Sequence, residues 1–193
     1  MKIFENLIPY RVIERPCVFT FGNFDGVHLG HQYIFRQVID QAHAQNLSSA
    51  ILTFRNHPAE ILRPDKAPSR LTSPEKKLEL IESFGFDIVI DLAFTKEIAE
   101  LSADDFFNKL LIMLPIACFV VGDDVAFGKD RVGNKEYLVA KSEALGFKVK
   151  ILEKFCVDGL VVSSTLVRKL IQEGEFEKVS ALLGRPYVGK DEG

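Results

Sequence analysis

The chain has 193 residues, of which 47% are hydrophobic and 26% charged, and its formal net charge is -3. A length of this order suits one compact domain, and the composition excludes a disordered or fibrous chain. The near balance of charges disfavours a protein that coats nucleic acid, so we expect no nucleic-acid partner. Any anionic ligand must then be held by a few local cations and backbone dipoles.

The cysteines and the hydropathy pattern predict a cytoplasmic protein. Cys17, Cys118 and Cys156 are far apart in sequence and form no C-x-x-C pair, which favours a reducing compartment. The most apolar stretch, residues 110–121, is shorter than the ~20 residues of a membrane span and contains Pro115. The N-terminal residues lack the core of a signal peptide. We therefore expect no membrane partner.

In the first half of the chain, short β-rich apolar runs alternate with segments of helical period. Strands are predicted over 17–21, 50–54 and 88–92, and a helix over 31–45. Residues 55–71 contain three prolines and fit neither period, so they predict a long loop. A second helix is predicted to start at Pro74, with Ser73 as its N-cap, and to end at Gly85.

The second half continues the same alternation. Ser102 and Asp105 have the spacing of a capping box and open a helix that Pro115 ends. A strand over 119–121 leads into a glycine-rich stretch, 122–133. The remaining predicted elements are a helix over 135–145 closed by Gly146, a strand over 148–152, and two short helices over 165–173 and 175–183.

This order of elements predicts the fold class. Alternating strands and helices imply right-handed crossovers, and hence a doubly wound α/β fold with a mostly parallel sheet and short C-terminal helices. Ligands of such sheets bind at the carboxyl ends of the strands. Polar or glycine-rich residues at strand ends are therefore the candidates for a functional site.

The end of the first predicted strand is the most informative stretch, F-G-N-F-D-G-V-H-L-G-H over 21–31. Its glycines permit a tight turn, and free N–H groups at a helix start attract anions. If the helix begins near Leu29, His28 and His31 straddle its first turn and can face one phosphate. The alternatives are two histidines that only cap a helix, or a zinc site, which the lack of further nearby ligands disfavours.

Two further strand ends carry polar residues. Asp123 and Asp124 follow the strand over 119–121, and they could bind Mg²⁺ through water or a ribose hydroxyl, or form a solvated acidic turn. In V-S-S-T-L-V-R, residues 162–168, three hydroxyl residues open a predicted helix and Arg168 lies on the same face. That motif is either an anion site or an N-cap with a surface arginine.

The loop after the strand over 50–54 is a weaker candidate. It begins with Arg55, Asn56, His57 and Pro58. An arginine or a histidine there could bind the phosphate of a second substrate, although ordinary loop structure explains these residues equally well.

These motifs together resemble one known family. F-G-N-F-D-G-V-H-L-G-H-Q at 21–32 resembles the H-x-G-H signature of the nucleotidyltransferase superfamily, in the form found in bacterial FAD synthetases. V-S-S-T-L-V-R at 162–168 is similar to the superfamily's I-S-S-T-x-x-R signature. T-F-R-N-H-P at 53–58 is similar to the family's T-F-x-P-H-P. The motifs occur in the family's order and span nearly the whole chain.

The resemblance implies a Rossmann-like nucleotidyltransferase domain over 1–187 followed by a tail over 188–193. The implied reaction is transfer of AMP from ATP to FMN, which gives FAD and pyrophosphate with the help of Mg²⁺. Carried over residue by residue, the implied catalytic residues are His28, His31 and Arg168. The implied nucleotide-binding residues are Gly22, Asn23, Phe24, Gly30, Asp124, Ser163, Ser164 and Thr165. Asp124 is also the implied metal ligand, and the implied flavin-binding residues are Asn56, His57 and Phe127.

The sequence departs from the family pattern at three positions. Val125 replaces an aromatic residue, Ala126 a larger polar residue and Asn56 a proline, all three in regions tied to flavin binding. The family usually continues from a segment like 183–187 into a riboflavin kinase domain. We expect that domain to be absent, so that either a separate riboflavin kinase supplies FMN or the chain is a truncated module of a bifunctional enzyme.

Two other functions stay open at this point. The chain could be a nucleotidyltransferase that acts on another phosphorylated acceptor, or a flavin- or nucleotide-binding module without catalysis.

Overall fold

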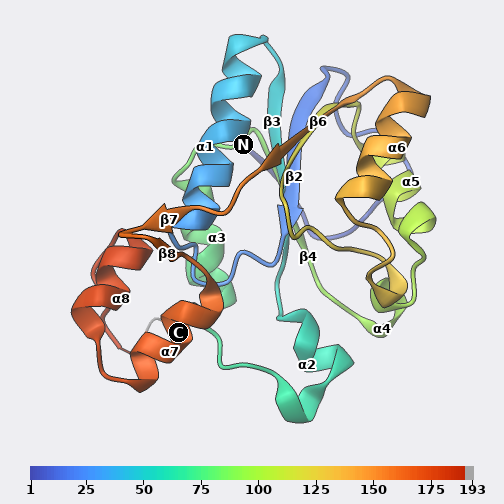
Figure 1. Cartoon of the computed structure of the whole chain (residues 1–193). Helices are drawn as coiled ribbons and strands as arrows, with labels where there is room; N and C mark the ends of the chain where they lie inside the picture. The colour runs from blue at the N-terminus through green and yellow to red at the C-terminus, as the bar shows by residue number, and fades with distance from the viewer. Residues whose placement is uncertain (190–193) are drawn as a thin grey trace.

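A six-stranded parallel sheet forms the centre of the computed structural model, which describes residues 1–189 (Figure 1). The strand order is β1-β4-β3-β2-β5-β6. The strands are β1 (Lys2–Phe4), β2 (Cys17–Gly22), β3 (Ser48–Phe54), β4 (Ile88–Leu92), β5 (Ile116–Gly122) and β6 (Lys148–Leu152). The doubly wound α/β fold is thus confirmed. The three-residue edge strand β1, which pairs with β4, was not predicted because it is too short to show a period.

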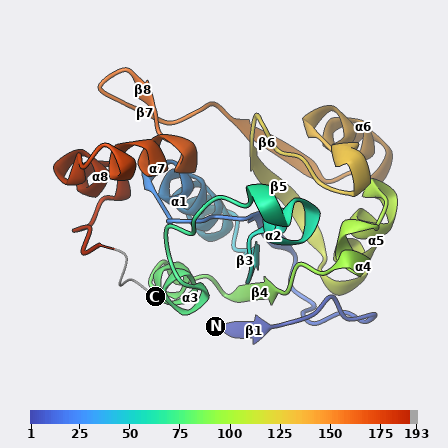
Figure 2. The same cartoon turned by 90° about the horizontal axis from the view of Figure 1, so that it is seen from below.

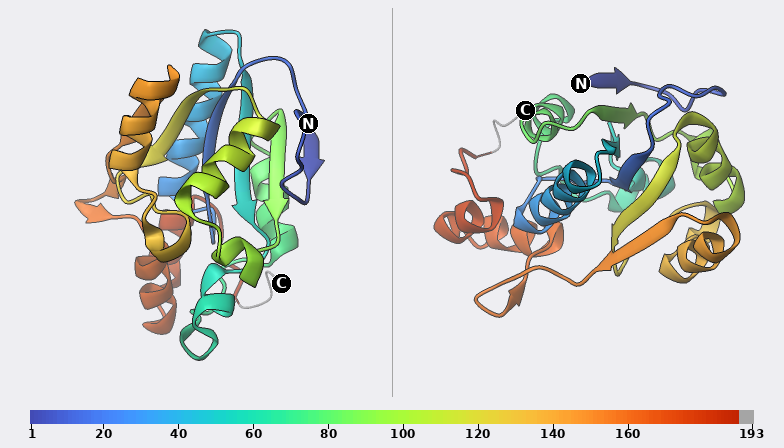
Figure 3. Two further views of the ribbon diagram at one scale, coloured as in Figure 1. Left: turned by 90° about the vertical axis from the view of Figure 1, so that its right-hand side faces the viewer. Right: turned by 90° about the horizontal axis from the view of Figure 1, so that it is seen from above.

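Helices cover both faces of the sheet (Figure 3). On one face, α1 (Leu29–Ala44) and α3 (Pro74–Glu82) bury Phe35, Val38 and Ile81 against alternate residues of the strands. On the other, α5 (Ala103–Met113) and α6 (Lys135–Leu145) bury Phe107 and Leu138 against the remaining alternate residues. Strands buried on both faces explain the continuous apolar runs in the sequence.

Three of the predicted helix boundaries are confirmed, whereas α3 ends at Glu82 with Ser83 as its C-cap and does not extend to Gly85. The Ser73 hydroxyl accepts from the N–H of Lys76 at 3.1 Å, and that of Ser102 accepts from the N–H of Asp105 at 3.0 Å. Gly146 closes α6 in the left-handed region, with φ of 77°. These local signals fix where each helix starts or stops, and so where the loops at the strand ends begin.

The prediction of an irregular loop over 55–71 is wrong in part, because that segment contains α2 (Pro58–Leu62) and the 3₁₀ helix η1 (Pro64–Lys66). The imidazole of His57 caps α2, Glu60 completes a capping box, and Pro58 occupies its first turn. Five residues are too few to show a helical period. The other short elements that were not predicted are α4 (Lys96–Ala99), η2 (Lys129–Arg131) and the antiparallel pair β7 (Cys156–Val157) and β8 (Leu160–Val161).

The C-terminal helices α7 (Ser164–Gln172) and α8 (Phe176–Leu183) pack together and lie beside α1 (Figure 2). Their own small core includes Val167, Val179 and Leu71 from the loop before α3. The Gln32 side chain of α1 donates to the carbonyl of Leu183 at 2.8 Å. Of the predicted tail over 188–193, residues 190–193 lie outside the described residues.

None of the helices within residues 1–189 is both long and apolar enough to cross a membrane. The cytoplasmic location stays a prediction.

Candidate active site

The strand order places the candidate motifs at one crevice. The chain goes from β2 to its neighbour β3 on one side, whereas β5 lies on the other side of β2. In an open α/β sheet, such a reversal leaves a crevice at the carboxyl ends of the two strands. The histidine motif follows β2, and Asp123 and Asp124 follow β5.

The turn between β2 and α1 has an unusual backbone conformation. Phe24 has φ of 50° and Val27 has φ of 40°, both in the left-handed region that side chains with a Cβ rarely adopt. Such conformations persist where surrounding contacts fix them, and they are common at functional sites. Here the Gln32 side chain donates to the carbonyl of Val27 at 2.9 Å.

Gly30 allows two of the motifs to meet. A Cβ on this residue would lie 3.2 Å from the ring of His28 and 3.3 Å from the carbonyl oxygen of Val162. Such distances are tighter than ordinary van der Waals contact. The absence of a side chain at this position therefore lets the segment before α7 approach the histidine turn.

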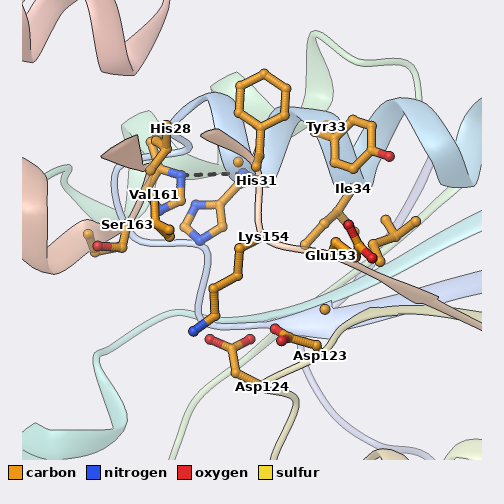
Figure 4. Close-up of a pocket in the computed structure, with 16 residues that line it drawn as sticks. His28, His31, Tyr33, Ile34, Asp123, Asp124, Glu153, Lys154, Val161 and Ser163 are labelled. Carbon is orange, nitrogen blue, oxygen red and sulfur yellow. Dashed lines mark hydrogen bonds between the residues drawn. The ribbon is translucent and has the colours of Figure 1, made fainter. Parts of the chain in front are cut away.

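His28 caps a helix and also lines a cavity, and its contact with a phosphate stays a prediction. It is the N-cap of α1, where its Nδ1 accepts from the N–H of His31 at 3.4 Å (Figure 4). Because Nδ1 accepts, the proton of the neutral ring lies on Nε2. His28 also lines a cavity, so this N–H is the group that it can offer to a ligand.

The two imidazoles lie face to face, with ring centroids 3.6 Å apart. Burial, together with the nearby cations Arg168 and Arg185, lowers the pKa of His28 to about 4. Burial, His28 and Lys77 also hold the pKa of His31 well below its ordinary value. Both rings are therefore neutral at pH 7. They can donate hydrogen bonds to phosphate oxygens but add no formal charge.

A first cavity of about 340 Å³ opens beside the histidines (Figure 4). It combines imidazole, hydroxyl, carboxylate and ammonium groups from four parts of the chain. Its polar lining residues are His28, His31, Tyr33, Asp123, Asp124, Glu153, Lys154, Ser163 and Ser164. In Figure 4 the side chain of Lys154 points toward Asp124. A cavity with such a lining suits a polar, anionic ligand.

A second cavity of about 430 Å³ adjoins the first and is lined by residues 20–25 at the end of β2. Its lining is more apolar and includes the aromatic rings of Phe54, Phe94, Phe106 and Phe127 together with His57. The residues that line both cavities are His31, Ile34, Gly122, Asp124 and Ser164. Two ligands bound in these cavities would therefore meet at His31.

The S-S-T motif is divided between structural and cavity-facing roles. Ser163 caps α7 by accepting from the N–H of Leu166 at 3.2 Å, and it also lines the first cavity. Ser164 donates to the carbonyl of Asp25 at 3.0 Å and lines both cavities. Thr165 is exposed and lines neither.

Arg168 lies apart from both cavities, although the sequence led us to expect its guanidinium at the anion site. Its Nε donates to the carbonyl of Ser69 at 2.7 Å, and its Nη2 pairs with the carboxylate of Asp25. The Asp25 carboxylate also accepts from the N–H of Leu71 at 3.0 Å. In this structure the arginine thus joins α7, the β2–α1 turn and the loop before α3. Its contact with a phosphate stays a prediction.

The expected flavin-binding residues are also split. His57 and Phe127 line the second cavity, whereas Asn56 lines neither cavity. The Asn56 amide instead donates to the carbonyl of Phe94 at 3.0 Å and accepts from its N–H at 2.8 Å. Phe94 does line the second cavity, so Asn56 acts on that cavity through its neighbour.

The residues around Asp124 are compatible with Mg²⁺. Within residues 1–189, the buried Oδ1 atoms of Asn23 and Asp123 have no hydrogen-bond partner. Mg²⁺ in nucleotide sites is usually held by one or two carboxylates together with substrate phosphates and water. This donor set therefore fits a metal that arrives with a nucleotide. The same residues include no cluster of three His, Cys, Asp or Glu side chains that could hold a metal.

Sequence reasoning missed three charged residues at the site. Asp25 lies within the histidine motif, and only its pairing with Arg168 reveals its importance. Lys154 lines the first cavity from the end of β6. Lys77 is buried in α3 one turn before Ile81, and this i, i+4 spacing on the apolar face was the available signal.

Comparison with known proteins decides the family, because the model of the FAD synthetase family matches residues 11–166. The chain belongs to the FAD synthetase family. A bifunctional riboflavin kinase/FMN adenylyltransferase from Haemophilus influenzae is 36% identical, with 97% of this chain and 61% of the relative aligned. The relative of the same name from Escherichia coli K12 is 35% identical over 91% of this chain and 56% of its own length. The relative of that name from Pseudomonas fluorescens is 37% identical over 97% of this chain and 60% of its own length.

The match to this chain thus spans about three fifths of the length of these relatives. A solved structure supports the fold as well. The crystal structure of a macrolide-efflux protein from Streptococcus pneumoniae has a TM-score of 0.80 and 25% sequence identity. That match covers 95% of this chain and 61% of the other.

Proposed function

We propose that this FAD synthetase domain transfers AMP from ATP to FMN, forming FAD and pyrophosphate. The observation that carries the proposal is the pair of cavities, one polar and one lined by aromatic rings, that meet at His31, Asp124 and Ser164. The relatives named above are called FMN adenylyltransferases, which agrees with this assignment.

The polar cavity suits ATP. His28, Ser163 and Ser164 line this cavity, and the Nε2–H of His28 and the hydroxyl of Ser163 are available to donate to phosphate oxygens. The Ser164 hydroxyl would first have to release the carbonyl of Asp25. The N-terminus of α7 adds the partial positive charge of its dipole. The second cavity suits the flavin, because rings such as Phe94 and Phe127 offer faces and edges to an isoalloxazine.

In the proposed reaction, a phosphate oxygen of FMN attacks the α-phosphorus of ATP. A new P–O bond forms, the bond between the α-phosphorus and its bridging oxygen breaks, and the electron pair leaves with pyrophosphate. The FMN phosphate is already ionised at neutral pH, so no strong general base is needed. The site contributes positioning and N–H donors that stabilise the developing charge.

Asn23 and Asp124 would hold Mg²⁺ between the two cavities, with Asp123 beside them. The metal would neutralise charge on the phosphates. Arg168 would need to exchange its partner Asp25 to reach a phosphate, and Thr165 would need its exposed hydroxyl turned toward the leaving group.

Two parts of the proposal concern the source of the flavin. The FMN would be the product of a riboflavin kinase, and its supply by a separate enzyme stays a prediction. Val125 and Ala126 line the flavin-side cavity with smaller side chains than the family pattern has. We expect them to weaken flavin affinity without preventing turnover.

The test is a product assay with purified protein, MgATP and a panel of phosphorylated acceptors. We expect FAD and pyrophosphate in equal amounts with FMN, and no product when EDTA is added. Product with another acceptor but not with FMN would favour a different nucleotidyltransferase. Binding of FMN and ATP with no product from any acceptor would favour a binding module.

A further inference from the structure

Lys77 is a buried lysine next to the site with no assigned role. Lys77 is only 5% exposed, whereas lysine side chains are almost never fully buried unless they are paired with an opposite charge. Within residues 1–189 no carboxylate lies within ion-pair distance of its Nζ. The Nζ donates instead to two main-chain carbonyls, that of Asn23 at 3.2 Å and that of Phe54. These carbonyls lie at the carboxyl ends of β2 and β3.

The Asn23 carbonyl is fixed by two donors, because the hydroxyl of Thr53 also donates to it at 3.1 Å. This carbonyl belongs to the peptide bond that joins Asn23 to Phe24. Phe24 has φ of 50°, a strained value that surrounding contacts must hold. Lys77 and Thr53 supply two of these contacts from α3 and β3.

Phe24 connects this peptide to the histidines. Its ring packs edge-on against His31, with centroids 5.2 Å apart and an angle of 84° between the planes. The His31 ring also stacks on the ring of His28, with centroids 3.6 Å apart. A change in the conformation of residues 23 and 24 would therefore move the ring that holds His31 in place.

We propose that Lys77 is a positioning residue for adenylyl transfer: its buried ammonium fixes the Asn23–Phe24 peptide and thereby orients His31 where the two cavities meet. This inference rests on the proposed function. The buried ammonium also acts on His31 directly, because its positive charge helps to keep that ring neutral and able to donate a hydrogen bond.

A purely structural role makes a different prediction. Replacing a buried ionic group by an apolar side chain of similar volume is often neutral or stabilising. Lys77→Met keeps the length of the side chain and removes its donors and charge. Under a structural role, this variant changes the melting temperature and leaves catalysis alone. Under our proposal, it changes catalysis whatever happens to the melting temperature.

The first test compares Lys77→Met with Lys76→Met in FAD formation. Lys76 is the preceding residue on α3, and its ammonium pairs with Glu79 at 3.0 Å, away from the site. We expect Lys77→Met to lower kcat by about 10- to 100-fold, with KM for ATP and FMN within about threefold of wild type. Lys76→Met should match wild type. An unchanged kcat in folded Lys77→Met would overturn the proposal.

A second variant keeps the proposal testable if Lys77→Met does not fold. Thr53→Val removes the other donor to the Asn23 carbonyl with almost no change in shape. We expect kcat to fall by about 3- to 10-fold, because one of two donors is lost. Wild-type kcat in Thr53→Val, together with loss of folding in Lys77→Met, would assign Lys77 to stability alone.

An NMR titration of His31 tests the coupling without any enzyme assay. The charged or titratable side chains that line the two cavities or act on the histidines are His28, Asp25, Tyr33, His57, Asp123, Asp124, Arg131, Glu153, Lys154, Arg168, Arg185 and Lys77. Of these, Lys77→Met changes only one. We expect the pKa of His31 to rise, because a nearby positive charge is lost. Altered His31 resonances in a protein that forms no FAD would refute the proposed function and leave the coupling intact, whereas unaltered resonances would refute the coupling.

Discussion

At the scale of single residues, His28 combines a helix cap with a position in the lining of the first cavity. Its Nδ1 accepts the hydrogen bond that caps α1, and this bond fixes the proton on Nε2, the nitrogen left free to donate to a ligand in the cavity that His28 lines. The sequence predicted the position of this residue but presented capping and ligand binding as alternatives. Capping and ligand binding are compatible roles, because they use different ring nitrogens, which point in different directions.

The lowered pKa of His28 predicts a pH dependence of stability. Its pKa is about 4 in the folded protein against 6.5 for an unperturbed histidine. Between pH 4 and pH 6.5 the unfolded chain binds more protons at this residue than the folded protein does. The contribution of neutral His28 to the free energy of unfolding is therefore complete above pH 6.5 and is lost as the pH falls toward 4. The shift corresponds to about 3 kcal/mol.

The measurement is the free energy of unfolding by urea at pH 7 and pH 4, for wild type and for His28→Asn. The other titrating groups are common to both proteins, so the difference between them reports His28 together with its effect on the pKa of His31. The wild type should lose more stability on acidification than the variant, by up to about 3 kcal/mol. Equal losses would show that His28 titrates normally in the folded state.

At the scale of elements, the site is assembled from loops that hold each other through backbone groups. The sequence placed the histidine motif and the Asp123–Asp124 pair at strand ends and the motif at 162–168 at a helix start, because hydrophobic periodicity and caps indicate where these elements begin and end. It did not predict partners distant in sequence. Arg168 pairs with Asp25 in another loop, and Asn56 bonds to Phe94, and neither partner is visible from spacing.

Arg168→Met should reduce both stability and activity. The side chains of Arg168 and Asp25 are only 14% and 7% exposed, so loss of one partner leaves a buried, unpaired carboxylate. We expect a loss of about 3 kcal/mol in the free energy of unfolding. Thermal and urea unfolding measure this loss. An Arg168→Met protein as stable as wild type would contradict the structural role of the ion pair.

The double variant Asp25→Asn/Arg168→Met separates the two roles of the arginine. It removes both charges and should recover part of the lost stability. If Arg168 also contacts a phosphate, kcat/KM for ATP stays at least about 10-fold below wild type in this double variant.

Asn56→Ala should weaken the binding of FMN more than the binding of ATP. The substitution leaves the N–H and carbonyl of Phe94 without partners, and Phe94 lines only the second cavity. We expect KM for FMN to rise roughly 10-fold, since releasing two backbone groups lets the loop move. KM for ATP serves as the internal control. Equal changes in both KM values would show that the two cavities are not separate substrate sites.

At the scale of the whole molecule, the doubly wound sheet explains why motifs 140 residues apart in sequence form one site. Parallel strands bring all their carboxyl ends to one edge, and the reversal between β2 and β5 opens a crevice there. The fold class could be predicted because strands and helices alternate so regularly. The short elements could not, since α2, α4 and the β7–β8 pair have too few residues to show a period.

The central claim is that the Nε2–H of His28 stabilises charge during AMP transfer to FMN. The most direct test is the turnover number of His28→Asn in FAD formation, measured beside its melting temperature. Asparagine is a good N-cap, so its side chain can still accept from the N–H of His31, but it lacks the Nε2–H. We predict a kcat about 100-fold below wild type with little change in melting temperature. Wild-type turnover in the folded variant would contradict the account.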